Sequence, residues 1–189
     1  MKKIPIKIVE ITSPSGKKAK DVLIDVYDYM EMPGNVEGKI KNFKEKYFEI
    51  VENAKKIMPK EKSKRKSTHF WRMGKLLFDF NTSINNEFEI TNYHQAIIRD
   101  FGLYNRSVVG HTLQFGEFFK KSEVLDLIPM SHYIELIWKA NMLNKLGLFD
   151  KEKKRLLDMA RKNTLPPHKE YREELNRLTK PVKQKAMKH

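Results

Sequence analysis

Polar residues suited to contacting nucleic acid recur in the segment "NRSVVGHTLQ", residues 105–114. From Arg106 onward they fall at positions i, i+1, i+5 and i+8, which lie on one side of an α-helix. Arg and Gln side chains can make paired hydrogen bonds to base edges, Ser can bond a phosphate, and an intervening Gly110 would let the helix backbone come close. We therefore predict a DNA-contacting surface here. Its residues are Asn105, Arg106, Ser107, His111 and Gln114.

Two short helices must hold this surface. The segment "YHQAIIRDF" is helical in pattern and stops at Gly102, and after a short polar break a second helix is expected from Arg106 to about Lys121. Asn92 is expected to cap the first helix. A short helix, a tight turn and a second helix are typical of a helix-turn-helix, whose second helix reads the major groove. The alternative is an ordinary corner between two helices with a solvated outer face.

Basic segments flank the predicted helical region. The stretch "PKEKSKRKS", residues 59–67, holds five basic residues and one acidic residue. It is either a mobile linker or an arm that follows phosphates. The tail, residues 179–189, has four lysines and no acidic residue, and we expect it to be disordered until it meets an anion. The predicted phosphate contacts of the linker are Lys62, Lys64, Arg65 and Lys66.

Composition favours a polyanionic partner and excludes several classes of protein. The 189 residues include 38 Lys and Arg against 24 Asp and Glu, a formal net charge of +14. Such a field attracts nucleic acid, anionic membrane surfaces or acidic proteins. The absence of Cys excludes disulfides and thiolate metal sites. We expect a cytoplasmic protein, because the N-terminus does not resemble a signal peptide and no apolar run is long enough to span a bilayer.

The sequence gives little indication of catalysis. A metal-dependent nuclease needs one Asp followed by an acid-x-Lys on a strand, so that two carboxylates hold the metal. Asp25 or Asp28 with "EGK", Glu37 to Lys39, is the best candidate, but "EGK" follows a turn-like segment. The six histidines lack metal-ligand spacing, and no phosphate-binding glycine loop is present. We therefore expect no enzymatic activity, metal or cofactor, and we expect Trp71 and Trp138 to be core residues.

The N-terminal region predicts a β-hairpin. Ile4, Ile6 and Ile8 alternate with other residues, "SPSG" is a turn signal, and "KDVLIDVYDY" is rich in β-branched and aromatic residues. A helix over residues 20–30 is the rival interpretation, since its apolar residues also fit a helical face.

A long amphipathic helix is predicted over residues 36–58. Its apolar residues are spaced 3-4-3-4-3, which is a heptad seam of nearly three repeats. They are Ile40, Phe43, Tyr47, Ile50, Ala54 and Ile57. Packing of this helix on its own domain is favoured, and a homodimer through residues 36–58 is the alternative.

Four segments resemble a known family. They are "RDFGLYNRSVVGHTLQFGEFF", "IPMSHYIELI", "EKKRLLDMARKN" and "YREEL". Over residues 92–178 these are similar to the helical N-terminal domain of YhcG-like proteins, which usually continues into a PD-(D/E)XK nuclease domain. Met130 stands where the family often has Trp, and the nuclease domain is absent from this chain. The resemblance implies a DNA-associated helical module of a mobile element or restriction-type defence system.

Together these patterns predict a mainly α protein: a multi-helix domain that contains a helix-turn-helix, with a small N-terminal β-hairpin. The expected regions are 1–35 (hairpin), 36–58 (long helix), 59–67 (linker), 68–178 (helical DNA-binding domain) and 179–189 (tail). Double-stranded DNA is the expected partner and no membrane association is expected. The alternatives are a DNA-targeting or accessory subunit of a nuclease or defence complex, and a dimeric adaptor.

Overall fold

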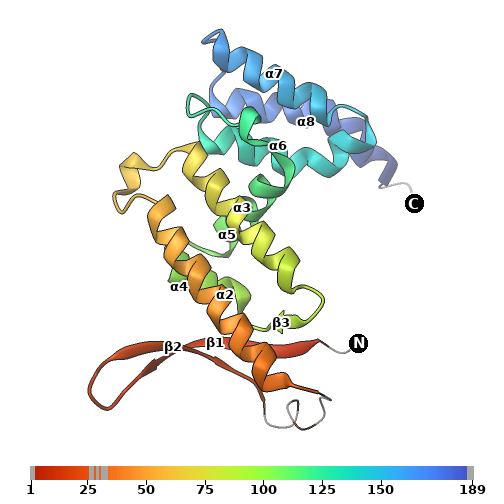
Figure 1. Ribbon diagram of the computed structural model, residues 1–189. Helices are drawn as coiled ribbons and strands as arrows, with labels where there is room; N and C mark the ends of the chain where they lie inside the picture. Colours follow the sequence, from red (N-terminus) through yellow and green to blue (C-terminus); the bar gives the residue numbers. More distant parts are fainter. Residues whose placement is uncertain (1–2, 26–27, 29, 31–33, 187–189) are drawn as a thin grey trace. The chain divides into compact units, whose positions relative to one another are not determined.

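A computed structural model describes residues 3–25, 28, 30 and 34–186, with side chains up to residue 180 (Figure 1). The described part is mainly helical, as predicted, with seven α-helices. Its sheet has three strands, one more than the predicted hairpin. The chain forms two compact units: unit 1 comprises residues 1–58 and 76–110, and unit 2 comprises residues 59–75 and 111–189. Helices α3 (Ser67–Ile84) and α5 (Arg106–Phe118) each contribute residues to both units. The unit boundaries therefore differ from the predicted regions.

The N-terminal hairpin of unit 1 is confirmed. Strands β1 (Ile4–Thr12) and β2 (Lys18–Leu23) pair antiparallel, with Lys7 opposite Leu23. Gly16 takes a positive φ of 77° in the turn, a conformation that glycine adopts at no steric cost. Alternation along β1 turns the three predicted isoleucines to one buried face. The rival helix over residues 20–30 is wrong up to Leu23, but Asp28 and Met30 near its end are helical. Its residues 26, 27 and 29 lie outside the described part.

A third strand, β3 (Phe88–Ile90), runs parallel to β1 with Phe88 beside Ile4. Three residues are too few for a sequence pattern, so this strand was not predicted. Asn92 follows it, directly before helix α4 (Tyr93–Phe101). The Asn92 side chain does not cap α4; it accepts from the Ile8 N–H at 3.0 Å and donates to the Ile8 carbonyl at 2.7 Å. The expected capping role was wrong because an edge of β1 offers this amide two partners.

Helix α2 (Val36–Ile57) agrees closely with the predicted long helix. Phe43, Tyr47 and Ala54 of the expected seam are buried in unit 1, together with Val51. Phe43 stacks on Tyr47 and contacts the rings of other buried residues, Phe80 and Phe88. The remaining seam residues Ile40, Ile50 and Ile57 are half-buried. Packing within unit 1 therefore accounts for the seam, and the homodimer through residues 36–58 has no support.

A buried carboxylate ties α4 to the rest of unit 1. The Asp100 side chain is 1% exposed and accepts the Tyr47 hydroxyl at 2.7 Å. Arg99 donates to both of its oxygens, and the Lys20 ammonium of β2 lies 3.3 Å away. Burial alone would raise the pKa of Asp100, but the hydrogen bonds from Arg99 and Tyr47 and the charge of Lys20 lower it. The carboxylate is thus held ionised inside the unit.

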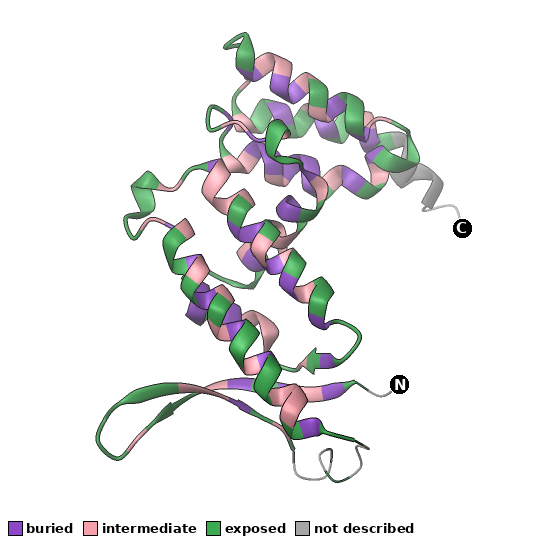
Figure 2. Ribbon diagram, viewed as in Figure 1, coloured by how far each residue is buried: buried purple, intermediate pink, exposed green. Residues whose placement is uncertain are grey.

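Unit 2 is built on three further helices: α6 (Met130–Lys145), α7 (Phe149–Arg161) and α8 (His168–Ala186). Figure 2 shows that buried and exposed residues alternate along them at helical spacing. Their buried sides meet an aromatic cluster in which Phe115, Phe119 and Tyr133 contact one another. Two 3₁₀ turns, η1 (Lys62–Lys64) and η2 (Lys121–Glu123), lie in the connecting segments.

Within unit 2, helices α3 and α5 touch backbone to backbone. A Cβ added at Gly74 would lie 1.9 Å from the Thr112 carbonyl oxygen, and one added at Gly116 would lie 2.2 Å from the Gly74 carbonyl carbon. Neither distance leaves room for a methyl group, so these two positions of the crossing require glycine. Gly116 is thus part of the buried face of α5.

Helix α3 begins with a contact that is distant in sequence. The backbone N–H of Thr68 donates to the Asp126 carboxylate at 3.0 Å, which supplies one of the partners that a helix N-terminus lacks. Buried Ser67 instead donates its hydroxyl to the Ile128 carbonyl at 2.6 Å. At the other end of the unit, α8 runs to Ala186, although the tail was predicted to be disordered from residue 179.

Candidate nucleic-acid interface

The helix that was predicted to read DNA forms at its expected start. Asn105 accepts the Val108 N–H through its side chain at 3.0 Å, so it acts as the N-cap of α5. Gly102 ends α4 in the left-handed conformation, with φ of 62°, as its position predicted. The two helices of the predicted motif are therefore present, while groove binding by the second remains a prediction. Asn105 therefore positions the start of α5 through its side-chain oxygen, while a contact of Asn105 with DNA stays a prediction.

The two faces of α5 follow the predicted division. Val109, Thr112 and Phe115 are buried, while Arg106 and Gln114 are exposed. Ser107 is exposed as well. Of the three exposed residues, Arg106 and Ser107 belong to unit 1 and Gln114 belongs to unit 2. Spacing alone was enough to sort these residues, because neighbours three and four positions apart share one helix face.

His111 has a protein partner that the sequence did not indicate. The Trp138 indole N–H donates to His111 Nε2 at 2.5 Å, and the two rings meet edge to face. Burial lowers the pKa of His111, which favours the neutral ring that can accept this bond. Trp138 is 52% exposed, so its assignment to the core was wrong. The helical period could have predicted this exposure. Tyr133, Leu136 and Ala140 form the buried stripe of α6, and Trp138 lies outside it.

The basic linker has internal contacts. Lys64 pairs with Glu61 at 2.8 Å, and the half-buried Arg65 donates through Nε to the Pro59 carbonyl at 3.1 Å. Lys62 and Lys66 are exposed. The segment contains the 3₁₀ turn η1 and so has a defined backbone there. This differs from the mobile linker, which was one of the two predictions.

Charge is distributed very unequally between the units. Unit 2 contains 24 of the 38 Lys and Arg residues but only 11 of the 24 Asp and Glu residues, a formal net charge of +13. Unit 1 contains the other 14 basic and 13 acidic residues, a net charge of +1. Nearly all of the positive charge that favours a polyanion therefore belongs to one compact unit.

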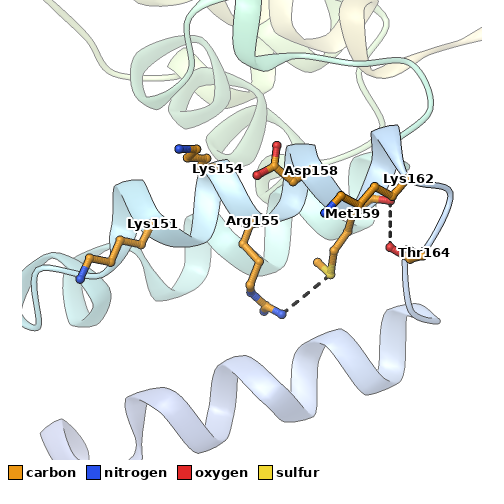
Figure 3. Close-up of a pocket in the computed structure, with 7 residues that line it drawn as sticks. All are labelled: Lys151, Lys154, Arg155, Asp158, Met159, Lys162 and Thr164. Atoms are coloured by element: carbon orange, nitrogen blue, oxygen red, sulfur yellow. Dashed lines mark hydrogen bonds between the residues drawn. The ribbon is translucent and has the colours of Figure 1, made fainter.

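One basic surface of unit 2 lies on helix α7 and was not singled out from the sequence. A pocket of about 440 Å³ is lined by the residues that Figure 3 labels, with Lys151 and Lys154 on one stretch of the helix and Lys162 just past its end. We call Lys151, Lys154 and Lys162 the α7 lysine face; all three are exposed. The "KEKK" run and its helical period could have revealed this face.

Acidic partners limit the charge that the other cations of α7 offer. Arg155 donates to Glu152 and Glu174, each at 2.8 Å. Arg161 lies 3.5 Å from Asp158, which also lines the pocket. The surplus positive charge on this surface therefore comes from the three lysines of the α7 lysine face.

The "MSHY" segment of the resemblance serves the interior of unit 2. Tyr133 accepts the Leu125 N–H at 2.9 Å and donates to the Glu123 carbonyl at 3.2 Å. The buried His132 stacks on Tyr171, and its Nε2 lies 3.0 Å from the Pro166 carbonyl oxygen. Both side chains thus connect α6 to the segments packed on it, so they give no evidence of a binding site.

The nuclease candidate does not take the arrangement that its chemistry needs. Glu37 and Lys39 lie in the first turn of α2 rather than on a strand. Asp25 and Asp28 line a pocket of about 330 Å³ beside β1, together with Lys7 and apolar residues. Within the described residues, no group of three His, Cys, Asp or Glu side chains is suited to hold a metal ion. None of the described helices combines the length and apolar character that crossing a bilayer needs.

No family model, curated protein sequence or solved structure matches the chain significantly.

Proposed function

We propose that this protein binds double-stranded DNA, chiefly through backbone phosphates on the basic surface of unit 2. The observation that carries the proposal is the charge distribution, +13 in unit 2 against +1 in unit 1. Phosphate neutralisation releases condensed counterions and supplies most of the affinity of non-specific DNA binding. A net charge concentrated on 96 residues is well suited to this task.

The exposed basic residues of unit 2 supply the phosphate contacts in this proposal. Lys62 and Lys66 of the linker act together with the α7 lysine face, and Lys64 contributes less because it pairs with Glu61. Arg65 contributes less, because its Nε is bonded to the Pro59 carbonyl. Contacts of this kind hold a protein on the duplex without reading its sequence.

Base reading is assigned to α5. Arg106 and Gln114 are exposed and carry the two side-chain types that bond guanine and adenine edges in pairs. Ser107 is exposed beside them and is suited to a phosphate. His111 and Asn105 position the helix through Trp138 and the N-cap. A Cβ at Gly110 would meet no atom within 4 Å, so nothing in the described protein requires glycine there.

The phosphate contacts are tested by salt dependence. Lys62, Lys64 and Lys66 are changed together to Gln, and the matched control changes the exposed lysines Lys7, Lys41 and Lys46 of unit 1. Duplex binding is followed by fluorescence anisotropy at several salt concentrations. The linker variant is expected to flatten the slope of log K against log salt by about 0.9 for each phosphate that is no longer neutralised, and the control should leave the slope unchanged. Equal slopes in all three proteins, or no duplex binding, would contradict the proposal.

Base reading is tested separately with Arg106→Ala and Gln114→Ala. Each is expected to cost about 1–3 kcal/mol at a selected duplex and to relax the preference at one base pair. Binding to a scrambled duplex and the melting temperature should change little, because both side chains are exposed. If specific and scrambled affinities stay as they were in both variants, α5 does not read bases.

A further inference from the structure

Unit 2 has a second concave surface, which shares no lining residue with the α7 pocket. It encloses about 380 Å³ and combines aromatic rings with lysines. We call it the aromatic hollow. Its aromatic residues are Trp71, Phe118 and Phe119, its lysines are Lys75, Lys120, Lys121 and Lys153, and Glu117 and Glu123 also line it.

The glycine crossing of α3 and α5 builds this hollow. Trp71 stands one turn before Gly74 on α3, and Phe119 follows Gly116 by about one turn at the end of α5. Because the backbones touch at the two glycines, the Trp71 indole N–H reaches the Phe119 carbonyl oxygen at 2.7 Å. The indole of Trp71 is therefore fixed in position while remaining only half-buried. Phe118, which also lines the hollow, is half-buried too, and its ring meets that of Phe149 edge to face.

The hollow has a positive rim. The Lys153 side chain is only 12% exposed, and its ammonium lies 3.2 Å from Glu123 and 5.3 Å from the centre of the Phe149 ring. This pair neutralises Glu123, which also accepts the Lys120 N–H at 2.8 Å. Lys120 and Lys121 are exposed and stand next to one another at the end of α5. With Glu117 as the opposing acid, the rim attracts anions.

We propose that the aromatic hollow binds one unpaired nucleotide of a nucleic-acid strand. Its base would stack on the rings of Trp71 and Phe118, and the flanking phosphates would lie on Lys120 and Lys121. Aromatic platforms beside cationic residues are the common means of holding single strands, and they tolerate any base because every base has a π face. A paired base has both faces covered within the duplex, so the site takes a frayed, extruded or single-stranded nucleotide. The inference rests on the proposed nucleic-acid binding, and it adds a site that accepts unpaired but not paired nucleotides.

The two tryptophans of the chain make the site directly observable. In a Trp138→Phe protein, Trp71 is the sole tryptophan and reports on the hollow. Titration with tetrathymidylate, which is too short to cover a wide surface, is expected to quench Trp71 emission. A blunt duplex without unpaired ends is expected to bind, as seen by anisotropy, and to leave Trp71 emission unchanged.

Paired substitutions separate the hollow from the general charge of unit 2. In the Trp138→Phe background, Lys120→Gln with Lys121→Gln is compared with Lys151→Gln with Lys154→Gln, which removes the same charge from the α7 lysine face. The first pair should flatten the salt dependence of tetrathymidylate binding by about 0.7 for each phosphate that is no longer neutralised, and the second should leave it unchanged. Phe118→Leu should weaken tetrathymidylate binding about 5- to 150-fold, which corresponds to one stacked base.

The outcomes distinguish the two proposals. Duplex binding without quenching of Trp71 by tetrathymidylate, or an equal effect of both lysine pairs, would overturn the hollow and leave the proposed function standing. Failure of the unsubstituted protein, which keeps the Trp138–His111 contact, to bind the duplex as well would overturn both. Equal quenching by tetraglutamate would identify an acidic peptide as the occupant and also overturn the nucleotide site. If Phe118→Leu lowers the melting temperature, its weaker binding could come from unfolding. The comparison of the two lysine pairs then tests the site, because their side chains are exposed and their substitution should leave the fold intact.

Discussion

Units 1 and 2 are almost equal in size, at 93 and 96 residues, but they differ in how far their acidic and basic residues cancel. In unit 1 the acidic and basic residues nearly cancel, and Asp100 draws Arg99, Lys20 and Tyr47 around a buried carboxylate. Unit 2 also holds a buried acid, Glu135, whose side chain is 2% exposed and accepts from Arg172 at 2.7 Å. Its basic residues nevertheless exceed its acidic residues by 13, and the lysines of the α7 lysine face are exposed. Both units therefore use charge pairs in folding, but only unit 2 carries a large surplus of positive charge that is available for a partner.

The largest effect is expected from removal of the buried carboxylate of unit 1. Asp100→Ala should lower the free energy of unfolding by about 3 kcal/mol, because it leaves buried Tyr47 and two cations without their common acceptor. Urea denaturation measures the change. The control is Asp158→Ala in unit 2, whose pair with Arg161 is exposed and should be worth about 1 kcal/mol or less. Similar costs for the two variants would mean that unit 1 does not depend on internal charge.

The second effect concerns the two glycines of α5. Gly116→Ala should destabilise the protein by about 1–3 kcal/mol or more, since the added methyl group meets the backbone at Gly74. Gly110→Ala has open space and should stabilise by about 0.5–1 kcal/mol, the ordinary gain for alanine within a helix. Thermal melting of the two variants shows whether each substitution stabilises or destabilises the protein. If Gly110→Ala also weakens duplex binding, the DNA approaches the helix backbone too closely at this position to accept a methyl group. Unchanged binding would mean that Gly110 does not lie in the interface.

The third effect is expected in Asp126→Ala, which removes the acceptor for the Thr68 N–H at the start of α3. The free energy of unfolding should fall by about 1 kcal/mol at neutral pH. Burial opposes ionisation of Asp126, but the hydrogen bonds from Thr68 outweigh it and lower the pKa. A lowered folded-state pKa stabilises above the ordinary carboxylate value of about 3.9, and this contribution disappears as the pH falls through the folded-state pKa. Denaturation at a series of pH values from about 7 downward should therefore show the difference between wild type and variant shrink once the pH falls below the ordinary carboxylate value. A difference that persists in acid would assign the effect to packing.

The smallest effect concerns the His111–Trp138 contact of unit 2. Because burial lowers the pKa of His111, the neutral ring persists to a pH below the ordinary histidine value of about 6.5. Protonation then removes the acceptor for the Trp138 N–H, so this contribution to stability is present above that ordinary value and disappears as the pH falls through the folded-state pKa. In a Trp71→Phe protein, Trp138 emission should change with a midpoint below about 6.5. His111→Gln should abolish the transition, and its persistence would point to another titrating group.

The sequence by itself determined the elements whose signals are local. The isoleucine alternation of β1, the limits of α2, the left-handed Gly102 and the two faces of α5 follow from neighbours two to four positions apart. Such neighbours fix which side chains share a face whatever the rest of the chain does. For the same reason the exposed Arg106 and Gln114 could be identified, while their binding of DNA is still a prediction.

Only the tertiary structure decided which distant groups meet. Asn92 bonds Ile8, Asp126 bonds the start of α3, Trp138 holds His111, and Gly74 touches Gly116. None of these pairs has a sequence signature, because each depends on which elements the topology brings together rather than on spacing along the chain. The interleaving of segments also decided that unit 2 carries +13 of the total +14, since residues 59–75 join a unit whose remainder begins at residue 111. A polyanion responds to charges that are close in space, so the chain order alone could not show where it would bind.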